Sequence, residues 1–195
     1  DMADGIVNID GGYLDDWDAR KALYWALFAG AHGHTYGCNP VWQMWDYGRK
    51  PMIYARRPWH EDMHLPGSGQ VQHAKHLLLS RPFLTRIPDQ SLIASEEGEG
   101  TQHVQATRDS RGSYALVYIP AANVMGPREV ELDLRSLSGE QVAAWWYDPR
   151  TGASRSLGAM PKQERMTFAP PAGGPDWVLV LDDAAARYPR PGKQR

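Results

Sequence analysis

The stretch Gly5-Ile6-Val7-Asn8-Ile9-Asp10-Gly11-Gly12 decides how the first half of the chain is interpreted. It is a short apolar run closed by two glycines, a pattern typical of a buried strand that runs into a loop. A helical pattern follows over Ala19 to Phe28, and a second short strand is predicted over residues 31–37. After a long aromatic loop, a second helix is predicted from Pro66 to Leu79. This order of elements predicts α/β structure over residues 1–88.

Such a unit cannot complete a fold alone, because two strands and two helices cannot cover both faces of a parallel sheet. We therefore expect residues 1–88 to be completed by upstream residues of the same polypeptide or by a partner chain. The chain opens at Asp1 with neither a start methionine nor a signal peptide. Any targeting segment is expected upstream of this residue.

The second half has strand-like runs separated by turn signals, which predicts an antiparallel β-sandwich over residues 89–183. Trp145 and Trp146 are adjacent on one of these strands, so one ring must face the core and the other outward, where it could bind a ligand or, as we favour, cement the interface with the first half. The predicted strands are Gln102–Thr107, Tyr114–Ile119, Arg128–Leu134, Val142–Tyr147 and Trp177–Leu181. Residues 184–195 are expected to be a frayed or linking tail.

Composition narrows the classes of function. The 195 residues carry a net charge of -2, which gives no electrostatic reason to expect nucleic acid or an anionic membrane as a partner. No apolar run approaches the roughly 20 residues that span a bilayer. One cysteine, Cys38, excludes an internal disulfide framework and a Cys-based zinc cluster. Eight Trp and nine Tyr suit the binding of amphipathic ligands such as sugars, although each ring has a competing role as a core residue.

Several motifs of the first half occur in an order that resembles a bacterial family of (β/α)-barrel glycoside hydrolases, which includes enzymes that cleave apiose from plant pectin. The matching segments are residues 24–31, 33–37, 41–43, 65–68, 80–82 and 88–90. The resemblance implies that residues 1–88 are the C-terminal portion of a (β/α)8 barrel, also called a TIM barrel. It implies a secreted or periplasmic enzyme that acts on a polysaccharide or oligosaccharide and needs no cofactor.

The second half is similar to the β-sandwich that follows the barrel in that family, often described as a "putative collagen-binding domain of a collagenase". Residues 112–120, 146–152 and 176–179 carry this similarity. The resemblance therefore implies α/β plus all-β architecture, with a barrel fragment followed by an accessory β-sandwich packed on it.

The resemblance also implies a catalytic position. Active sites of β/α barrels lie at the C-terminal ends of the strands, and the family pattern after the first of these strands is Gly-Glu-Pro-x-Tyr-Glu. In this chain Asp10 stands at the position of the first, catalytic Glu, Tyr13 is retained, and Leu14 replaces the second acid. Glycoside cleavage generally uses two carboxylates, and the partner of Asp10 would come from a strand upstream of Asp1. We therefore expect no turnover by this chain alone.

Four further residues are candidate substrate contacts. His34 and Tyr36 alternate along the predicted second strand, so both are expected to face the barrel mouth and to hydrogen-bond sugar hydroxyls. The competing interpretation, a buried His and Tyr that tie loops together, is equally supported. Trp42 and Trp45 are predicted to form a stacking platform for a sugar ring, against an at least equally supported role in anchoring the loop.

Residues His60-Glu61-Asp62-Met63-His64 form a literal H-E-x-x-H motif, which on a helix can bind Zn²⁺ and would indicate a metalloprotease. Pro58 and Pro66 leave room for at most two helical turns around it, whereas zinc proteases present the motif from a long helix. The sequence therefore favours no metal site, with His60, Glu61 and His64 as the alternative. A second alternative is a non-catalytic module that binds carbohydrate or collagen.

Overall fold

The computed structural model describes residues 7–8, 12–120 and 128–193. Its centre is a six-stranded sheet in which every neighbouring pair is antiparallel, in the order β3-β4-β5-β10-β7-β8. The strands are β3 (Arg86–Pro88), β4 (Gln105–Asp109), β5 (Tyr114–Pro120), β10 (Asp176–Asp183), β7 (Gln141–Tyr147) and β8 (Ser154–Pro161).

A second, two-stranded antiparallel sheet covers one face of this sheet. It consists of β6 (Val130–Asp133) and β9 (Arg165–Phe168). Alternate side chains of the large sheet, such as Val117 and Trp146, form a buried apolar cluster with side chains from these two strands. The expectation of an antiparallel, β-rich second half is thereby confirmed, within a fold that mixes helices and sheet.

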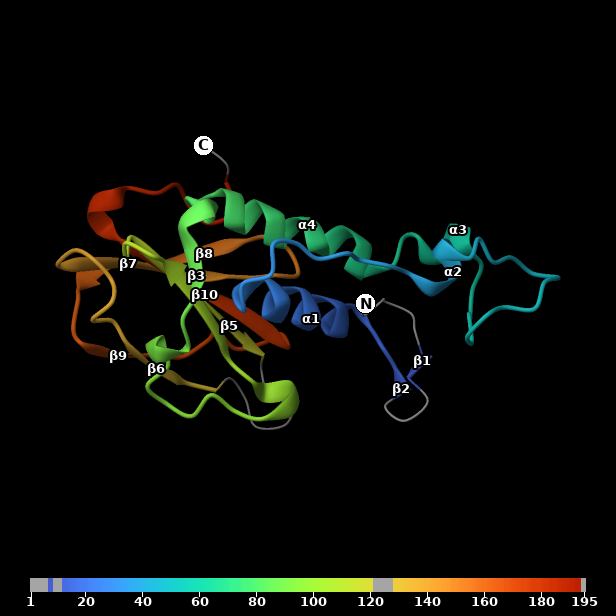
Figure 1. Ribbon diagram of the computed structural model, residues 1–195, viewed down its shortest axis with the longest axis horizontal. Helices are drawn as coiled ribbons and strands as arrows, with labels where there is room; N and C mark the ends of the chain where they lie inside the picture. Colours follow the sequence, from blue (N-terminus) through green and yellow to red (C-terminus); the bar gives the residue numbers. More distant parts are fainter. Residues whose placement is uncertain (1–6, 9–11, 121–127, 194–195) are drawn as a thin grey trace.

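Two helices cover the opposite face of the same sheet, α1 (Asp16–Phe28) and α4 (Pro66–Leu79), which lie side by side in Figure 1. Tyr24 of α1 stacks on Tyr118 of β5 with ring centroids 5.0 Å apart and planes 4° apart. Trp145 packs against this second cluster, whereas Trp146 belongs to the first. All seven residues of β5 are buried because both faces of the strand are covered.

The two helices start where the sequence signals a start. At α1 a capping box forms, in which the Asp15 carboxylate accepts from the backbone N–H groups of Trp17 and Asp18 and the Asp18 side chain accepts from the Asp15 backbone. Pro66 is the first residue of α4, where its missing N–H costs nothing. Shorter 3-10 helices are η1 (Phe83–Thr85), η2 (Gln90–Leu92), η3 (Gly100–Gln102) and η4 (Ala184–Ala186).

The predicted strands of the first half need correction. Near the N-terminus the described strands are β1 (Val7–Asn8) and β2 (Gly12–Tyr13), two residues each, which pair with one another in antiparallel fashion. Residues 31–37 form no strand and run beside α1 and α4. A strand exists only where a neighbour accepts and donates its backbone hydrogen bonds, and the described residues offer residues 31–37 no such neighbour.

The aromatic loop between the two long helices forms a separate lobe, residues 38–65, which projects away from the sheet in Figure 1. It contains two four-residue helices, α2 (Asn39–Trp42) and α3 (Trp59–Asp62), which contact each other. We call this region the aromatic lobe.

Among the described residues, no helix has the length and apolar character that a membrane span requires.

The C-terminal segment does not fray over its described residues, which corrects the expectation of a loose tail from residue 184. The hydroxyl of Tyr188 hydrogen-bonds that of Ser113 at 2.8 Å, and the Tyr188 ring packs edge-on against Tyr114. Further on, the backbone N–H of Gly192 donates to the hydroxyl of Ser80, at the end of α4. Residues 188–192 therefore pack between the C-terminal end of α4 and the start of β5.

Candidate functional site

The structure brings His34 and Tyr36 together in one cavity of about 480 Å³. The other walls of this cavity are mainly apolar side chains of α1 and α4, among them Leu23, Val71 and Leu78, with His32, Gln72 and Lys75 as polar members. Partial burial lowers the pKa of His34, which favours the neutral imidazole at pH 7. A neutral imidazole can both donate and accept a hydrogen bond, as recognition of a hydroxyl group requires.

Tyr13 lies elsewhere, at the end of β2, where the guanidinium of Arg56 stacks over its ring at 4.0 Å from the centroid. This contact joins the aromatic lobe to the N-terminal strand pair. The predicted catalytic position, Asp10, falls three residues before Tyr13 and lies outside the described residues. Sequence reasoning did not identify the contact of Arg56 with Tyr13, because the two residues lie far apart in the chain.

The two tryptophans of the predicted platform differ in their surroundings. Trp42 is 52% exposed at the end of α2. Trp45 is 9% exposed, donates its indole N–H to the backbone carbonyl of Arg49 at 2.8 Å and packs edge-on against Tyr47. The ring of Trp45 therefore anchors the aromatic lobe, and Trp42 is the member of the pair with a face available to a ligand.

The side chains of Asn39 and Gln43 hold residues 52–53 of the aromatic lobe through hydrogen bonds. The buried Asn39 donates to the carbonyl of Ile53 at 2.7 Å, and Gln43 binds both the N–H and the carbonyl of Met52, each at 2.8 Å. Ile53 and Tyr54 have positive φ values of 51° and 24°, which residues with a Cβ rarely adopt. A backbone held in this region by surrounding contacts is a feature of binding and catalytic sites.

The H-E-x-x-H segment lacks the helix on which its zinc chemistry depends. His60 lies in α3, which ends at Asp62, so the exposed His64 lies outside the helix. Asp62 is buried in a pair with Arg57 at 2.7 Å, and its carbonyl accepts from the thiol of Cys38. Within the described ranges, no group of three or more His, Cys, Asp or Glu side chains is placed to hold a metal ion.

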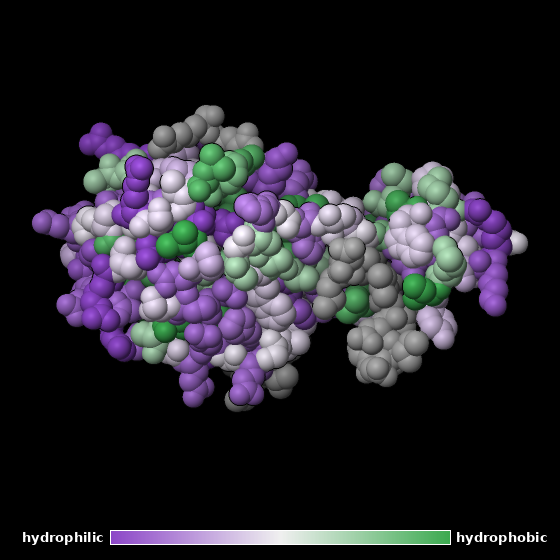
Figure 2. Space-filling view, viewed as in Figure 1, coloured by the Kyte–Doolittle hydropathy of each residue, from purple (hydrophilic) through white to green (hydrophobic). Residues whose placement is uncertain are grey.

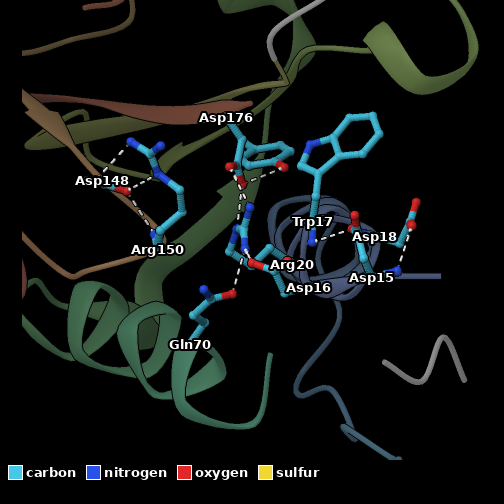
Figure 3. Close-up of polar contacts among 10 residues, drawn as sticks. Asp15, Asp16, Trp17, Asp18, Arg20, Gln70, Asp148, Arg150 and Asp176 are labelled. Atoms are coloured by element: carbon cyan, nitrogen blue, oxygen red, sulfur yellow. Dashed lines mark hydrogen bonds and ion pairs between the residues drawn. The ribbon is translucent and has the colours of Figure 1, made fainter. Parts of the chain in front are cut away.

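A buried polar network ties α1 to the sheet, and Figure 3 shows it in close-up. Arg20 of α1 forms two hydrogen bonds of 3.0 Å to the carboxylate of Asp176, the first residue of β10. Tyr118 donates to the same carboxylate, and Arg20 also donates to Asp16 and to Gln70 of α4. Burial raises the pKa of Asp176 even though the Arg20 guanidinium acts in the opposite direction.

A second pair repeats this arrangement at the other end of β10. Arg81, which follows α4, donates to both carboxylate oxygens of Asp182 at 3.0 and 2.6 Å, and both residues are buried. The two ends of one strand therefore hold the two long helices. Sequence reasoning did not identify either pair, because the partners lie 156 and 101 residues apart.

Two family descriptions match the chain, one in each half. Residues 2–85 match the family described as "Apiosidase-like, catalytic domain", and residues 87–182 match "Putative collagen-binding domain of a collagenase". The family resemblance of the sequence is thus confirmed in both halves. No curated protein matches the chain.

Two solved structures are similar over almost the whole chain. One is described as a glycoside hydrolase, with 32% identity and a TM-score of 0.84 over 94% of this chain. The other is a glycoside hydrolase family 5 protein from Bacteroides vulgatus ATCC 8482, with 30% identity and a TM-score of 0.85 over 96% of this chain. This chain spans 41% of the length of each of these proteins.

Proposed function

Since its two halves match an apiosidase-like catalytic domain and the sandwich of the collagen-binding type, we propose that this chain is the C-terminal region of a glycoside hydrolase. The complete enzyme is a bacterial, secreted or periplasmic protein that acts on a polysaccharide or oligosaccharide. Residues 1–88 supply the last β/α units of its TIM barrel, and the chain alone has no turnover.

The observation that carries this proposal is the cavity between residues 31–37 and the helices α1 and α4. In a β/α barrel each strand packs against helices on its outer side and bonds to a strand on either side. Residues 31–37 have the helices but no neighbouring strand among the described residues, and the walls are mainly apolar. Apolar surface of this kind is stable when further protein covers it. Upstream strands of the barrel are the partner that fits.

The chemistry follows from the strand ends of such a barrel. Two carboxylates flank the bond to be cleaved, one as the acid and the other as the nucleophile or base. Asp10 is proposed as one of them, from its place in the family pattern, and the other carboxylate lies upstream. Tyr13, His34 and Tyr36 are proposed to contact the sugar through hydrogen bonds, and the exposed ring of Trp42 through stacking.

The sandwich is proposed to act as a fixed layer under the barrel helices. One face of its sheet is covered by α1 and α4, and the other by β6 and β9. A freely moving module for carbohydrate or collagen would have an open face for its ligand, whereas among the described residues both faces of this sheet are covered except at the exposed edge strand β8. This arrangement favours the structural role over the binding-module alternative.

Hydrolysis by the complete polypeptide tests the proposal. The chain joined to its upstream coding sequence is assayed for release of reducing sugar from plant and bacterial polysaccharides, beside the chain alone. We expect turnover only in the complete polypeptide, with a loss of about a hundredfold or more in Asp10→Asn. Asp10→Glu reaches about 1 Å further and is expected to raise the rate. Turnover by the chain alone, or an unchanged rate in Asp10→Asn, would refute the proposal.

A further inference from the structure

Residues 184–193, which follow β10, carry positive charge without any acid. Arg187, Arg190 and Lys193 give this segment a net charge of +3, whereas the whole chain has a net charge of -2. Figure 2 shows that hydrophilic residues cover most of the body of the protein, including the upper left of the view, where the C-terminal segment runs in Figure 1. Charge, and not exposed apolar surface, is therefore the property on which recognition by this segment depends.

Two of these three cations meet in one cavity. The backbone N–H of Lys193 donates to the carbonyl of Arg190 at 3.1 Å, which closes a turn and brings the two residues close together. A cavity of about 340 Å³ lies at this turn, and the residues that line it are Gly152, Arg190, Pro191, Gly192 and Lys193. Gly152 comes from the turn after β7, so the cavity lies between that turn and the C-terminal segment. No acid is among the residues that line it.

Neither cation of the cavity is neutralised within the described part of the chain. Arg190 and Lys193 are both exposed, and neither forms an ion pair with a described carboxylate. Asp148, in the same turn as Gly152, is already paired with Arg150 at 2.8 Å. The cavity therefore presents two positive charges that have no counter-ion from the described protein.

The backbone that carries these two cations is held in place on both sides. The hydroxyl of Tyr188 hydrogen-bonds that of Ser113, and the backbone N–H of Gly192 donates to the hydroxyl of Ser80. Pro191, between these two anchors, is buried. Cations on a fixed backbone lose less conformational entropy on binding a ligand than cations on a free tail do. The segment is therefore preorganised for an anion.

We propose that Arg190 and Lys193 bind a phosphate group in this cavity. The planar guanidinium of Arg190 matches two oxygens of a phosphate group through parallel hydrogen bonds, and the ammonium of Lys193 supplies a compact charge for a third oxygen. A phosphate group carries up to about two negative charges near pH 7, which balances the two unpaired cations. The cavity has room for a free phosphate ion or for a small phosphate monoester. The site shares no residue with the cavity of His34 and Tyr36 and does not depend on the proposed function.

Binding by the chain is measured calorimetrically at low ionic strength with inorganic phosphate, glycerol 3-phosphate and glycerol. We expect both phosphate compounds to bind and glycerol, which lacks the charge, not to bind. Arg190→Gln should weaken binding about tenfold, and Lys193→Gln about threefold because it removes a single contact in place of a fork. Arg187→Gln removes the same charge from the same segment, but Arg187 lies in a different cavity, which Glu140 and Asp183 also line. This control should change the affinity less than about twofold.

The variants separate a defined phosphate site from general attraction between charges. Tighter binding of glycerol 3-phosphate than of inorganic phosphate identifies a phosphate monoester as the ligand, and the reverse order identifies the free ion. Equal losses in Arg190→Gln and Arg187→Gln, or no binding of either phosphate compound at millimolar concentration, would overturn the assignment. Because binding is measured without turnover, failure of the complete polypeptide to hydrolyse glycans would refute the proposed function and leave this result unaffected.

Discussion

Arg20 and Asp176 form a bidentate ion pair between α1 and the first residue of β10, with both hydrogen bonds at 3.0 Å. The two side chains are 1% and 0% exposed. Because burial raises the pKa of Asp176 despite this partner, the ion pair does not fully offset the loss of hydration. The pair therefore specifies how the helix sits on the sheet more than it adds to stability.

Removing one partner of this pair should be costly. Arg20→Met leaves the Asp176 carboxylate buried without its counter-ion, and we expect the free energy of unfolding to fall by about 3–5 kcal/mol. Replacing both partners, as Arg20→Met with Asp176→Leu, should recover most of that loss because no unpaired charge remains. Urea unfolding of the two variants and the original chain provides the measurement. A double variant as unstable as the single one would contradict this account.

Contact between α4 and the turn after β7 can be tested at a glycine. Gly152 has φ +71°, and a Cβ at this position would lie 2.7 Å from Nδ1 of His73 in α4. Gly173 has φ +87° with open space around it, so it shares the backbone cost without the collision. We expect Gly173→Ala to cost about 1 kcal/mol, from the left-handed backbone alone. Gly152→Ala should cost about 1–3 kcal/mol more, from overpacking. Equal thermal unfolding of the two variants would show that the helix does not pack closely here.

The carboxyl group of Asp89 should make the free energy of unfolding depend on pH. Burial acts to raise its pKa, but hydrogen bonds from Ser91 and Arg108 outweigh burial and hold the pKa below the ordinary value of 3.8. The folded state therefore binds fewer protons at this carboxyl than the unfolded state does near pH 4. The resulting stability is fully present above pH 3.8 and is lost as the pH falls through the lowered pKa. In urea unfolding, Asp89→Asn should lose less stability than the original chain between pH 5 and pH 2, and an equal loss would contradict this assignment.

Local patterns in the sequence account for much of the fold. The two long helices and most strands of the sheet follow from periodicity and capping, and the opposite surroundings of Trp145 and Trp146 follow from strand alternation. β8 was missed because it is an exposed edge strand of mixed polar and small residues, interrupted by Gly158, and so carries little hydrophobic signal. Burial of both faces of β5 could not be predicted, because the covering helix α1 lies about 90 residues away in the chain.

The site was less accessible to sequence reasoning. Burial of Trp45 and exposure of Trp42 depend on how the aromatic lobe folds on itself, which two identical residues three positions apart do not reveal. The prediction of a strand over residues 31–37 was wrong for the described structure because its hydrogen-bond partners are not among the described residues. The roles of Asp10, Tyr13, His34 and Tyr36 in catalysis and substrate binding stay predictions.

The proposal that residues 31–37 are a barrel strand without its neighbours is tested most directly by hydrogen exchange of the backbone amides of residues 32–36. Exchange is measured in this chain alone and in the polypeptide that includes its upstream coding sequence. We predict rapid exchange in the chain alone and slowing by orders of magnitude in the complete polypeptide, since strand pairing protects amides until the sheet opens. Amides that are already protected in the chain alone, or that still exchange rapidly in the complete polypeptide, would contradict the account.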